Sequence, residues 1–116
     1  IAQQVSPQMA EFITPLETEV ARLEKVTAGL LQRSSSDFNA AGSASVEYLQ
    51  LFGCVTYAWL WARVAAVAQN NNDGYYVAKL ATARFYFAHL LPQTKALAES
   101  IDRGSDALMQ LSAELF

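Results

Sequence analysis

Apolar residues recur along the first segment, residues 7–32, at alternating spacings of three and four, which is typical of one face of an α-helix. These positions are Met9, Phe12, Leu16, Val20, Leu23, Thr27 and Leu30. Ser6 before Pro7 fits an N-cap followed by proline at the first helical position. Pro15 is expected to kink this helix, although two pieces starting at Ser6 and Thr14 fit the pattern too. The segment therefore predicts an amphipathic helix.

The second segment, residues 38–69, is apolar nearly all round. A helix of this kind is either buried on every side or lies in lipid. The 21 residues from Tyr48 to Ala68 are enough to span a bilayer. However, Gln50 and Arg63 interrupt the run, and no basic cluster flanks it. We therefore expect a buried central helix, and a membrane span is disfavoured.

The third segment, residues 75–102, repeats the helical spacing. Its apolar face carries Leu80, Ala83, Phe87, Leu90, Thr94, Leu97 and Ile101. Asp73 is expected to cap its N-terminus, Pro92 to kink it, and Gly104 to end it. Ser105 is then placed to cap a last short helix. That helix would hold Leu108, Met109 and Leu111.

Loop-forming clusters separate these segments at residues 33–37, 70–74 and 103–106. Helix-forming residues dominate the composition, with 20 Ala and 14 Leu against 5 Gly and 3 Pro. The pattern predicts an all-α fold, an antiparallel up-and-down bundle of three long helices plus a short C-terminal helix. Residues 1–116 are expected to form a single domain. Because the chain starts at Ile1 without an initiator Met, we expect it to be part of a longer protein.

Charge is scarce and uneven. Hydrophobic residues make up 53% of the chain and charged residues 16%, which excludes a disordered chain. The net charge of -3 and the lack of a basic cluster disfavour nucleic acid as a partner. The 35 residues from Phe38 to Asn72 contain only two charged side chains, Glu47 and Arg63. This charge-poor stretch is the feature that a structure must explain.

No catalytic, cofactor-binding or metal-binding constellation is predicted. The single cysteine, Cys54, lies in the most apolar segment, where a packed thiol is favoured over a nucleophile. The single histidine, His89, is expected on the polar side of the third helix and exposed to solvent. One Cys and one His offer almost nothing for a zinc site.

Two charges in apolar surroundings suggest a structural ion pair. Glu47 lies in the charge-poor segment, and Arg84 stands between Ala83 and Phe85. Burying such groups is costly unless they pair or reach water. We predict that Arg84 pairs with Glu47 on the second helix. The alternative is that the Arg head extends to solvent past an apolar stem.

The aromatic residues suggest an interface. Trp59 and Trp61 lie two positions apart, or about 200° around a helix, so they cannot share one face. A bundle of this size buries one stripe and part of a second on each helix, so some rings are expected at its surface. The candidate interface residues are Trp61, Arg63 and Phe85.

Two longer runs carry a resemblance to a known family. They are SVEYLQLFGCVTYAWLWARVA from Ser45 to Ala65 and KLATARFYFAHLLPQTKAL from Lys79 to Leu97. Together with the opening PQMAEFITPLETEVARLEKVTAGL, they resemble the C-terminal extension of bacterial acyl-CoA dehydrogenases, in particular the methylmercaptopropionyl-CoA dehydrogenase-like subgroup. In that family the flavin, the acyl-CoA and the catalytic glutamate belong to the preceding catalytic portion. The resemblance therefore transfers no catalytic residue to this chain.

The resemblance implies an accessory, non-catalytic domain of an FAD-dependent enzyme that dehydrogenates acyl-CoA thioesters. FAD is expected in the parent enzyme and not in this segment. The expected partners are the catalytic portion and a second copy of the chain, and the expected location is the cytoplasm. Two alternatives remain, a membrane-associated bundle and a helical module that binds an apolar ligand between Tyr57, Trp59 and Phe87.

Overall fold

The structure, a computed structural model, describes residues 7–115. Its α-helices are α1 (Ala10–Ser34), α2 (Ala40–Ala68), α3 (Gly74–Phe85), α4 (Thr94–Asp102) and α5 (Asp106–Met109). The described residues contain no strand, so the all-α prediction is confirmed. The predicted N-cap at Ser6 lies outside the described residues.

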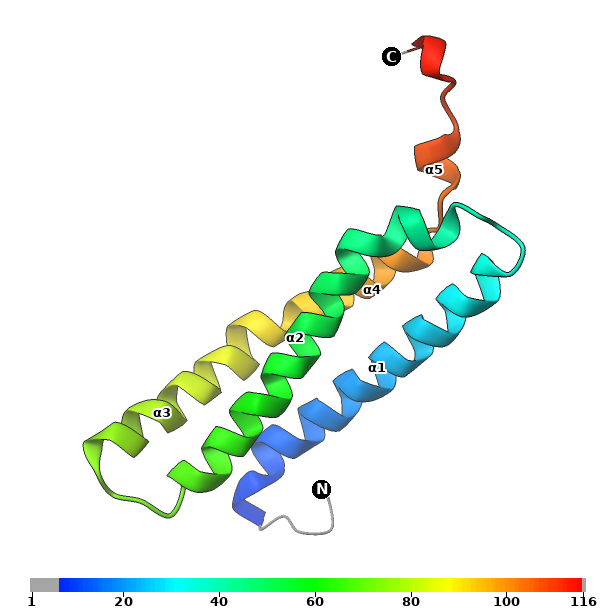
Figure 1. The fold of residues 1–116 in the computed structure, drawn as a ribbon. Coiled ribbons are helices and arrows are strands. Elements are labelled where there is room, and N and C mark those ends of the chain that lie inside the picture. The colour runs from blue at the N-terminus through cyan, green and yellow to red at the C-terminus, as the bar shows by residue number, and fades with distance from the viewer. Residues whose placement is uncertain (1–6, 116) are drawn as a thin grey trace.

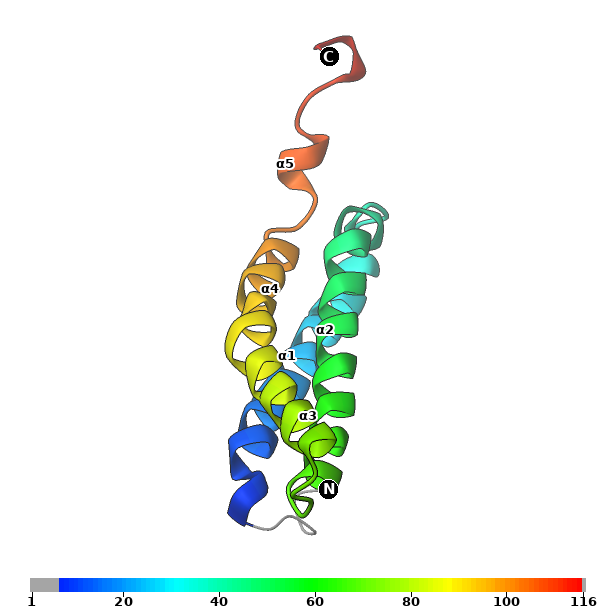
Figure 2. The ribbon, with the colours of Figure 1, turned by 90° about the vertical axis from the view of Figure 1, so that its left-hand side faces the viewer.

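The helix α2 is the centre of the bundle (Figure 1). It runs antiparallel to α1 and to the helical segment formed by α3 and α4, and it packs against both. Figure 2 shows the same bundle from the side, with α5 and the chain beyond it stretching away from the other helices. The molecule is accordingly long and flat, measuring 63 × 30 × 14 Å.

The first segment forms one helix rather than two. A short 3₁₀ turn, Pro7–Met9, leads into α1, and Pro15 lies inside that helix without ending it. Most of the predicted apolar face is buried or half-buried, but Val20 is 38% exposed. Glu19 and Val26 are buried instead, because the inward face of α1 is centred about one position away from the predicted stripe.

The third segment is divided at Pro92, as predicted, but the division is a change of helix type. A π-helical turn, Tyr86–Leu90, and a 3₁₀ turn, Leu91–Gln93, join α3 to α4. The N–H of Leu91 bonds the carbonyl of Tyr86, five residues earlier. The extra residue in this turn changes which leucine points inward there. Leu90, predicted to be buried, is therefore 39% exposed, and Leu91 is 3% exposed.

The ends of the third segment agree with the sequence in two of three features. The Asp73 carboxylate accepts a hydrogen bond from the Tyr75 N–H at 2.9 Å, which is the predicted N-cap. Gly104 ends α4 with φ at 76°, a left-handed conformation that favours glycine. The prediction for Ser105 is wrong, because its hydroxyl caps no helix and donates to the Asp37 carboxylate at 2.6 Å.

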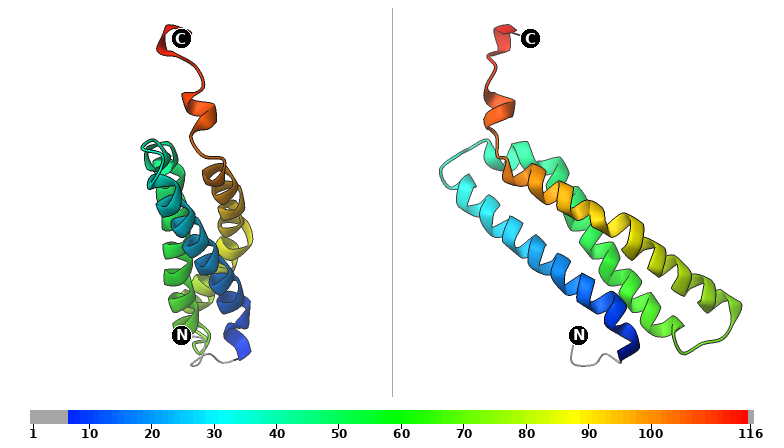
Figure 3. Two further views of the ribbon diagram at one scale, coloured as in Figure 1. Left: turned by 90° about the vertical axis from the view of Figure 1, so that its right-hand side faces the viewer. Right: turned by 180° about the vertical axis from the view of Figure 1, so that it is seen from behind.

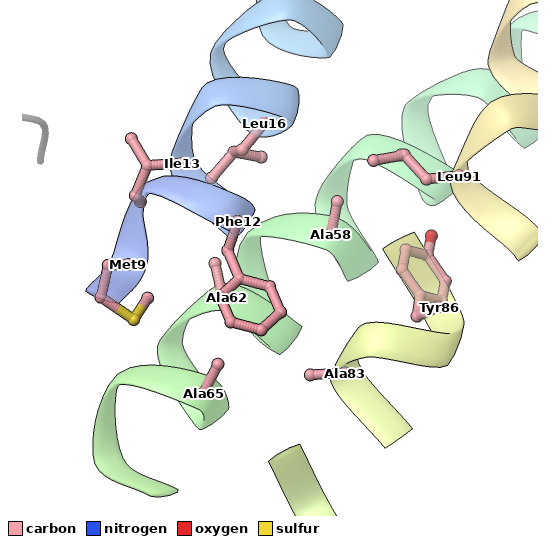
Figure 4. Close-up of a cluster of buried hydrophobic side chains, with 10 residues drawn as sticks. All are labelled: Met9, Phe12, Ile13, Leu16, Ala58, Ala62, Ala65, Ala83, Tyr86 and Leu91. Carbon is pink, nitrogen blue, oxygen red and sulfur yellow. The ribbon is translucent and has the colours of Figure 1, made fainter. Parts of the chain in front are cut away.

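Two apolar clusters hold the bundle together. The first lies where α1 begins and is drawn in Figure 4. Its buried residues are Met9, Phe12, Ile13, Leu16, Ala58, Ala62, Ala65, Ala83, Tyr86 and Leu91. The second, nearer the other end, contains Val26, Ala44, Leu51, Val55, Ala98 and Ile101. Small alanine side chains on α2 let the neighbouring helices approach closely in the first cluster, where the Phe12 and Phe87 rings meet edge to face at 5.2 Å.

Candidate functional site

The predicted ion pair has a different partner. Nε and Nη2 of Arg84 donate to Oε1 of Glu11 at 3.0 and 2.9 Å, so the predicted Glu47–Arg84 pair is wrong. In the antiparallel α2–α3 hairpin, Arg84 lies level with about residue 58, and Glu47 is about 16 Å farther along α2. Glu11, at the start of α1, lies beside Arg84, and both side chains are about half-exposed.

The three candidate interface residues are not brought together. Trp61 is half-buried against the first apolar cluster. Arg63 is exposed, and its guanidinium lies 5.0 Å from the centre of the Trp59 ring. Phe85 is 55% exposed on α3 and stacks on His89 with ring centres 5.0 Å apart. Whether any of them forms an interface stays a prediction.

Cys54 is half-buried and takes part in a contact between α2 and the π-helical turn. Its backbone carbonyl accepts a hydrogen bond from the Tyr86 hydroxyl at 2.5 Å, which ties α2 to the π-helical turn. Burial raises the pKa of the Cys54 thiol, so the reactive thiolate is disfavoured. Burial also raises the pKa of Tyr86 well above its usual value, and the nearby Cys54 adds to that shift. Both groups therefore stay protonated at neutral pH.

His89 is exposed in the π-helical turn and contacts the Phe85 ring. Within residues 7–115, no group of three or more His, Cys, Asp and Glu side chains is arranged to hold a metal ion.

Exposed apolar side chains gather along α1 and α2 on a surface that we call the α1/α2 face. Large exposed side chains define it: Val20 and Leu31 on α1, and Leu49, Phe52 and Trp59 on α2. Two grooves hollow this surface, one beside Phe52 and one beside Trp59, which Glu17 and Glu24 also line. Leu49 and Phe52 were not predicted as surface residues, although their spacing from Trp59 places all three on one side of a helix.

A second hollow, the α2/α3 groove, lies near the loop between those helices. It is lined by Leu60, Trp61, Arg63, Val64, Val67, Tyr75, Tyr76 and Lys79. Its walls are apolar and aromatic, and its two charged side chains are cations. The Lys79 ammonium lies 5.3 Å from the centre of the Tyr75 ring. Like the Arg63 guanidinium over Trp59, it makes a cation–π contact. Trp61 and Arg63 thus share this groove, whereas Phe85 lies outside it.

Comparison with known protein families now identifies the domain. The family described as acetyl-CoA dehydrogenase C-terminal like matches residues 1–112. The chain belongs to this family. A search of curated proteins finds no match.

Membership of the acetyl-CoA dehydrogenase C-terminal-like family confirms the coarser part of the sequence reading. The chain is a C-terminal domain of the acyl-CoA dehydrogenase type, associated with a catalytic portion.

Neither the N-terminus of α3 nor the α1/α2 face of this C-terminal domain fits FAD. A flavin dinucleotide needs a place for its pyrophosphate, commonly a glycine-rich turn at a helix N-terminus. At the N-terminus of α3, beside Gly74, the backbone N–H of Tyr75 is already bound by the Asp73 carboxylate, whose negative charge would repel a phosphate. The grooves beside Trp59 and Phe52 contain no basic residue.

The ligand-pocket alternative does not hold for this C-terminal domain, because its three residues do not converge. Tyr57 lines a shallow hollow with Cys54 and Leu97. Trp59 faces α1, and Phe87 packs on Phe12 in the core. No common pocket is formed by the three proposed side chains.

The membrane alternative concerns α2. By length and composition alone, α2 would suffice to cross a bilayer, a property shared by core helices of soluble proteins. One side of it carries buried residues that pack against α1, α3 and α4. The expectation that this domain does not span a membrane stays a prediction.

Proposed function

We propose that this chain is the non-catalytic C-terminal domain of an FAD-dependent acyl-CoA dehydrogenase and supplies packing surface to the rest of that enzyme. The parent enzyme oxidises the bond between the α and β carbons of an acyl-CoA thioester, and its catalytic portion holds the flavin. Within the family, the sequence motifs favour the methylmercaptopropionyl-CoA dehydrogenase-like subgroup. The proposed location is the cytoplasm.

The observation that carries the proposal is an excess of exposed surface that includes many large apolar side chains. The chain exposes 8033 Å², whereas a compact monomer of its mass of 12.7 kDa would expose about 6,200 Å². The radius of gyration is 18.1 Å, against about 13 Å expected for a compact domain of this length. The excess is larger than the about 800 Å² that each partner contributes to a standard protein interface.

The α1/α2 face is the part of this surplus that best suits the catalytic portion. Leu49 is 73% exposed and Phe52 is 50% exposed, although both lie on the central helix. Fully burying one such side chain contributes about 1.5–3 kcal/mol. Grooves flanked by large apolar side chains are suited to receive helices of another structural unit. We therefore assign this face to contacts with the catalytic portion.

The test uses the complete protein that carries this sequence, with the double substitution Leu49→Asp and Phe52→Asp. Limited proteolysis is expected to release the variant domain at least tenfold faster than the parent domain, because the α1/α2 face no longer docks. Val77→Asp is the matched control, since Val77 is 56% exposed on α3 and lies outside this face. Equal release rates for parent and double variant would refute the docking role.

The flavin is tested separately. The complete protein is expected to carry the yellow flavin absorbance and to dehydrogenate an acyl-CoA with an artificial electron acceptor, while residues 1–116 alone do neither. Stoichiometric FAD on the isolated chain would overturn the non-catalytic assignment. A complete protein without flavin would overturn the assignment of the parent enzyme.

A further inference from the structure

The chain beyond Gly104 carries apolar side chains that cover nothing. Leu108, Met109, Leu111 and Leu115 are 62%, 58%, 50% and 71% exposed. None of the residues 106–115 is buried, and the segment leaves the bundle beyond α4, as both views in Figure 3 show. Its base is fixed by the hydrogen bond from Ser105 to Asp37. We call residues 106–115 the C-terminal arm.

The arm has the sequence of an amphipathic helix. Leu108, Leu111 and Leu115 follow spacings of three and four, so a continuous helix would place them on one face. The structure already has helical turns at both ends, α5 and the 3₁₀ turn Ala113–Leu115. An apolar surface alongside would stabilise the intervening residues as helix, because most helical stability in proteins comes from packing.

The α2/α3 groove matches this helix in length and chemistry. On α2 the groove extends from Leu60 to Val67, two helical turns or about 10 Å, and the stripe from Leu108 to Leu115 has the same length. The groove walls are the aromatic and aliphatic side chains that typically receive leucines in helix-in-groove recognition.

The charges are complementary as well. Arg63 and Lys79 form no ion pair with a carboxylate among residues 7–115. The arm contains two acidic residues, Asp106 and Glu114, and no basic residue. In the amphipathic arrangement Glu114 flanks the leucine stripe, where it would meet the cationic rim of the groove. Such pairing favours correct association over other contacts.

The C-terminal arm cannot reach the α2/α3 groove of its own bundle. Ser105 lies beside Asp37, next to the start of α2, whereas Val64 lies about 36 Å farther along that helix. An arm of ten helical residues reaches only about 15 Å, so it cannot fill the groove of its own bundle. In an antiparallel pair with two-fold symmetry, by contrast, each arm lies near the groove of the other copy.

We propose that two copies of this chain pair antiparallel, each placing its C-terminal arm as an amphipathic helix in the α2/α3 groove of the other. The pairing uses neither Leu49 nor Phe52. It therefore goes beyond docking on the catalytic portion and does not depend on it.

The experiment measures the molar mass of the 116-residue chain by sedimentation equilibrium over a range of concentrations. The parent chain is expected to dimerise. Leu111→Asp, at the centre of the arm, is expected to weaken the dimer at least tenfold. Leu49→Asp, on the α1/α2 face, is expected to leave it unchanged. A parent chain that stays monomeric at every concentration overturns the proposal. A Leu111→Asp chain that dimerises as the parent does also overturns it.

Charge reversal provides the decisive test of the proposed pairing. One variant carries Asp106→Lys and Glu114→Lys, and the other carries Arg63→Glu and Lys79→Glu. Each alone is expected to be monomeric, because arm and groove then have the same sign. Mixed in equal amounts, they are expected to form a heterodimer, because both exchanged contacts are again complementary. Failure of the mixture to associate overturns the proposal.

Two controls keep these outcomes specific. The variant with Lys25→Glu and Lys95→Glu makes the same change in net charge at exposed cations outside the groove, and it is expected to dimerise as the parent does. Thermal unfolding of every variant is measured in parallel. The exchanged residues are at the surface or at the groove rim, so each variant is expected to melt as a folded bundle.

Discussion

The two sides of α2 are both apolar, but they differ in the size of their side chains. The inner side is largely alanine toward the first cluster, with Ala58, Ala62 and Ala65 at most 4% exposed. The outer side carries large side chains, among them Leu49, Phe52 and Trp59. Small residues allow neighbouring helices to approach closely, whereas large exposed ones offer contact area to a further partner.

This difference explains the charge-poor stretch in the sequence. A helix buried on one side only would be expected to carry polar residues on the other. The outer side of α2 instead carries Arg63 and little other charge. The apolar surplus of α2 thus divides into an inner part that folds the bundle and an outer part left for association. Both proposals above depend on the outer part.

The largest predicted effect contrasts the two sides by removing one leucine from each. Leu51→Ala removes a side chain that is 0% exposed and is expected to lower the free energy of unfolding by about 2–5 kcal/mol. Leu49→Ala, two positions away and 73% exposed, is expected to change it by less than about 0.5 kcal/mol. Urea unfolding of the 116-residue chain measures both. Equal losses would contradict the division of α2 into two sides.

A smaller effect is expected from the hydrogen bond that joins α2 to the π-helical turn. Tyr86→Phe removes the donor to the Cys54 carbonyl and is expected to lower the free energy of unfolding by about 1 kcal/mol at neutral pH. Tyr57→Phe is the control, since Tyr57 is 60% exposed. A Tyr86→Phe protein with the same free energy of unfolding as the parent would show that this hydrogen bond does not stabilise the bundle.

The same tyrosine gives the bundle a pH dependence. Folding raises the pKa of Tyr86 above the unfolded value of about 10. The folded state therefore retains the phenol proton when the unfolded state has lost it, and the stability from Tyr86 is fully present below about pH 10 and declines as the pH rises further. Urea unfolding at increasing pH above this value is expected to show a falling free energy of unfolding in the parent. The fall is expected to be smaller in Tyr86→Phe.

The sequence predicted the helices well because periodicity is a local property. The extents of α1 and α2, the cap at Asp73 and the end at Gly104 all depend on residues a few positions apart. The π-helical turn was not predicted, since a spacing rule based on 3.6 residues per turn has no place for an extra residue. This single insertion exchanged Leu90 for Leu91 in the core.

Contacts between distant residues were predicted less well. The partner of Arg84 depends on the level at which α1, α2 and α3 lie side by side, and no local pattern specifies that level. The same holds for Ser105, whose hydroxyl bonds Asp37 across the end of the bundle. For the surfaces, the sequence indicated that aromatic rings would be exposed. It named Trp61 as the candidate interface ring, whereas Trp59 is 38% exposed and Trp61 is half-buried.

The smallest expected effect concerns the ion pair at the outer edge of the bundle. Exposed pairs contribute about 0.2–1 kcal/mol, because water and salt already screen the charges. Arg84→Ala is therefore expected to lower the free energy of unfolding by no more than this, and less at high salt. A double-mutant cycle of Arg84→Ala with Glu11→Gln is expected to show coupling. The same cycle with Glu47→Gln is expected to show none, because that carboxylate lies too far along α2. Coupling to Glu47 in place of Glu11 would mean that α3 packs at a different level on α2, and the division of that helix into inner and outer sides would have to be redrawn.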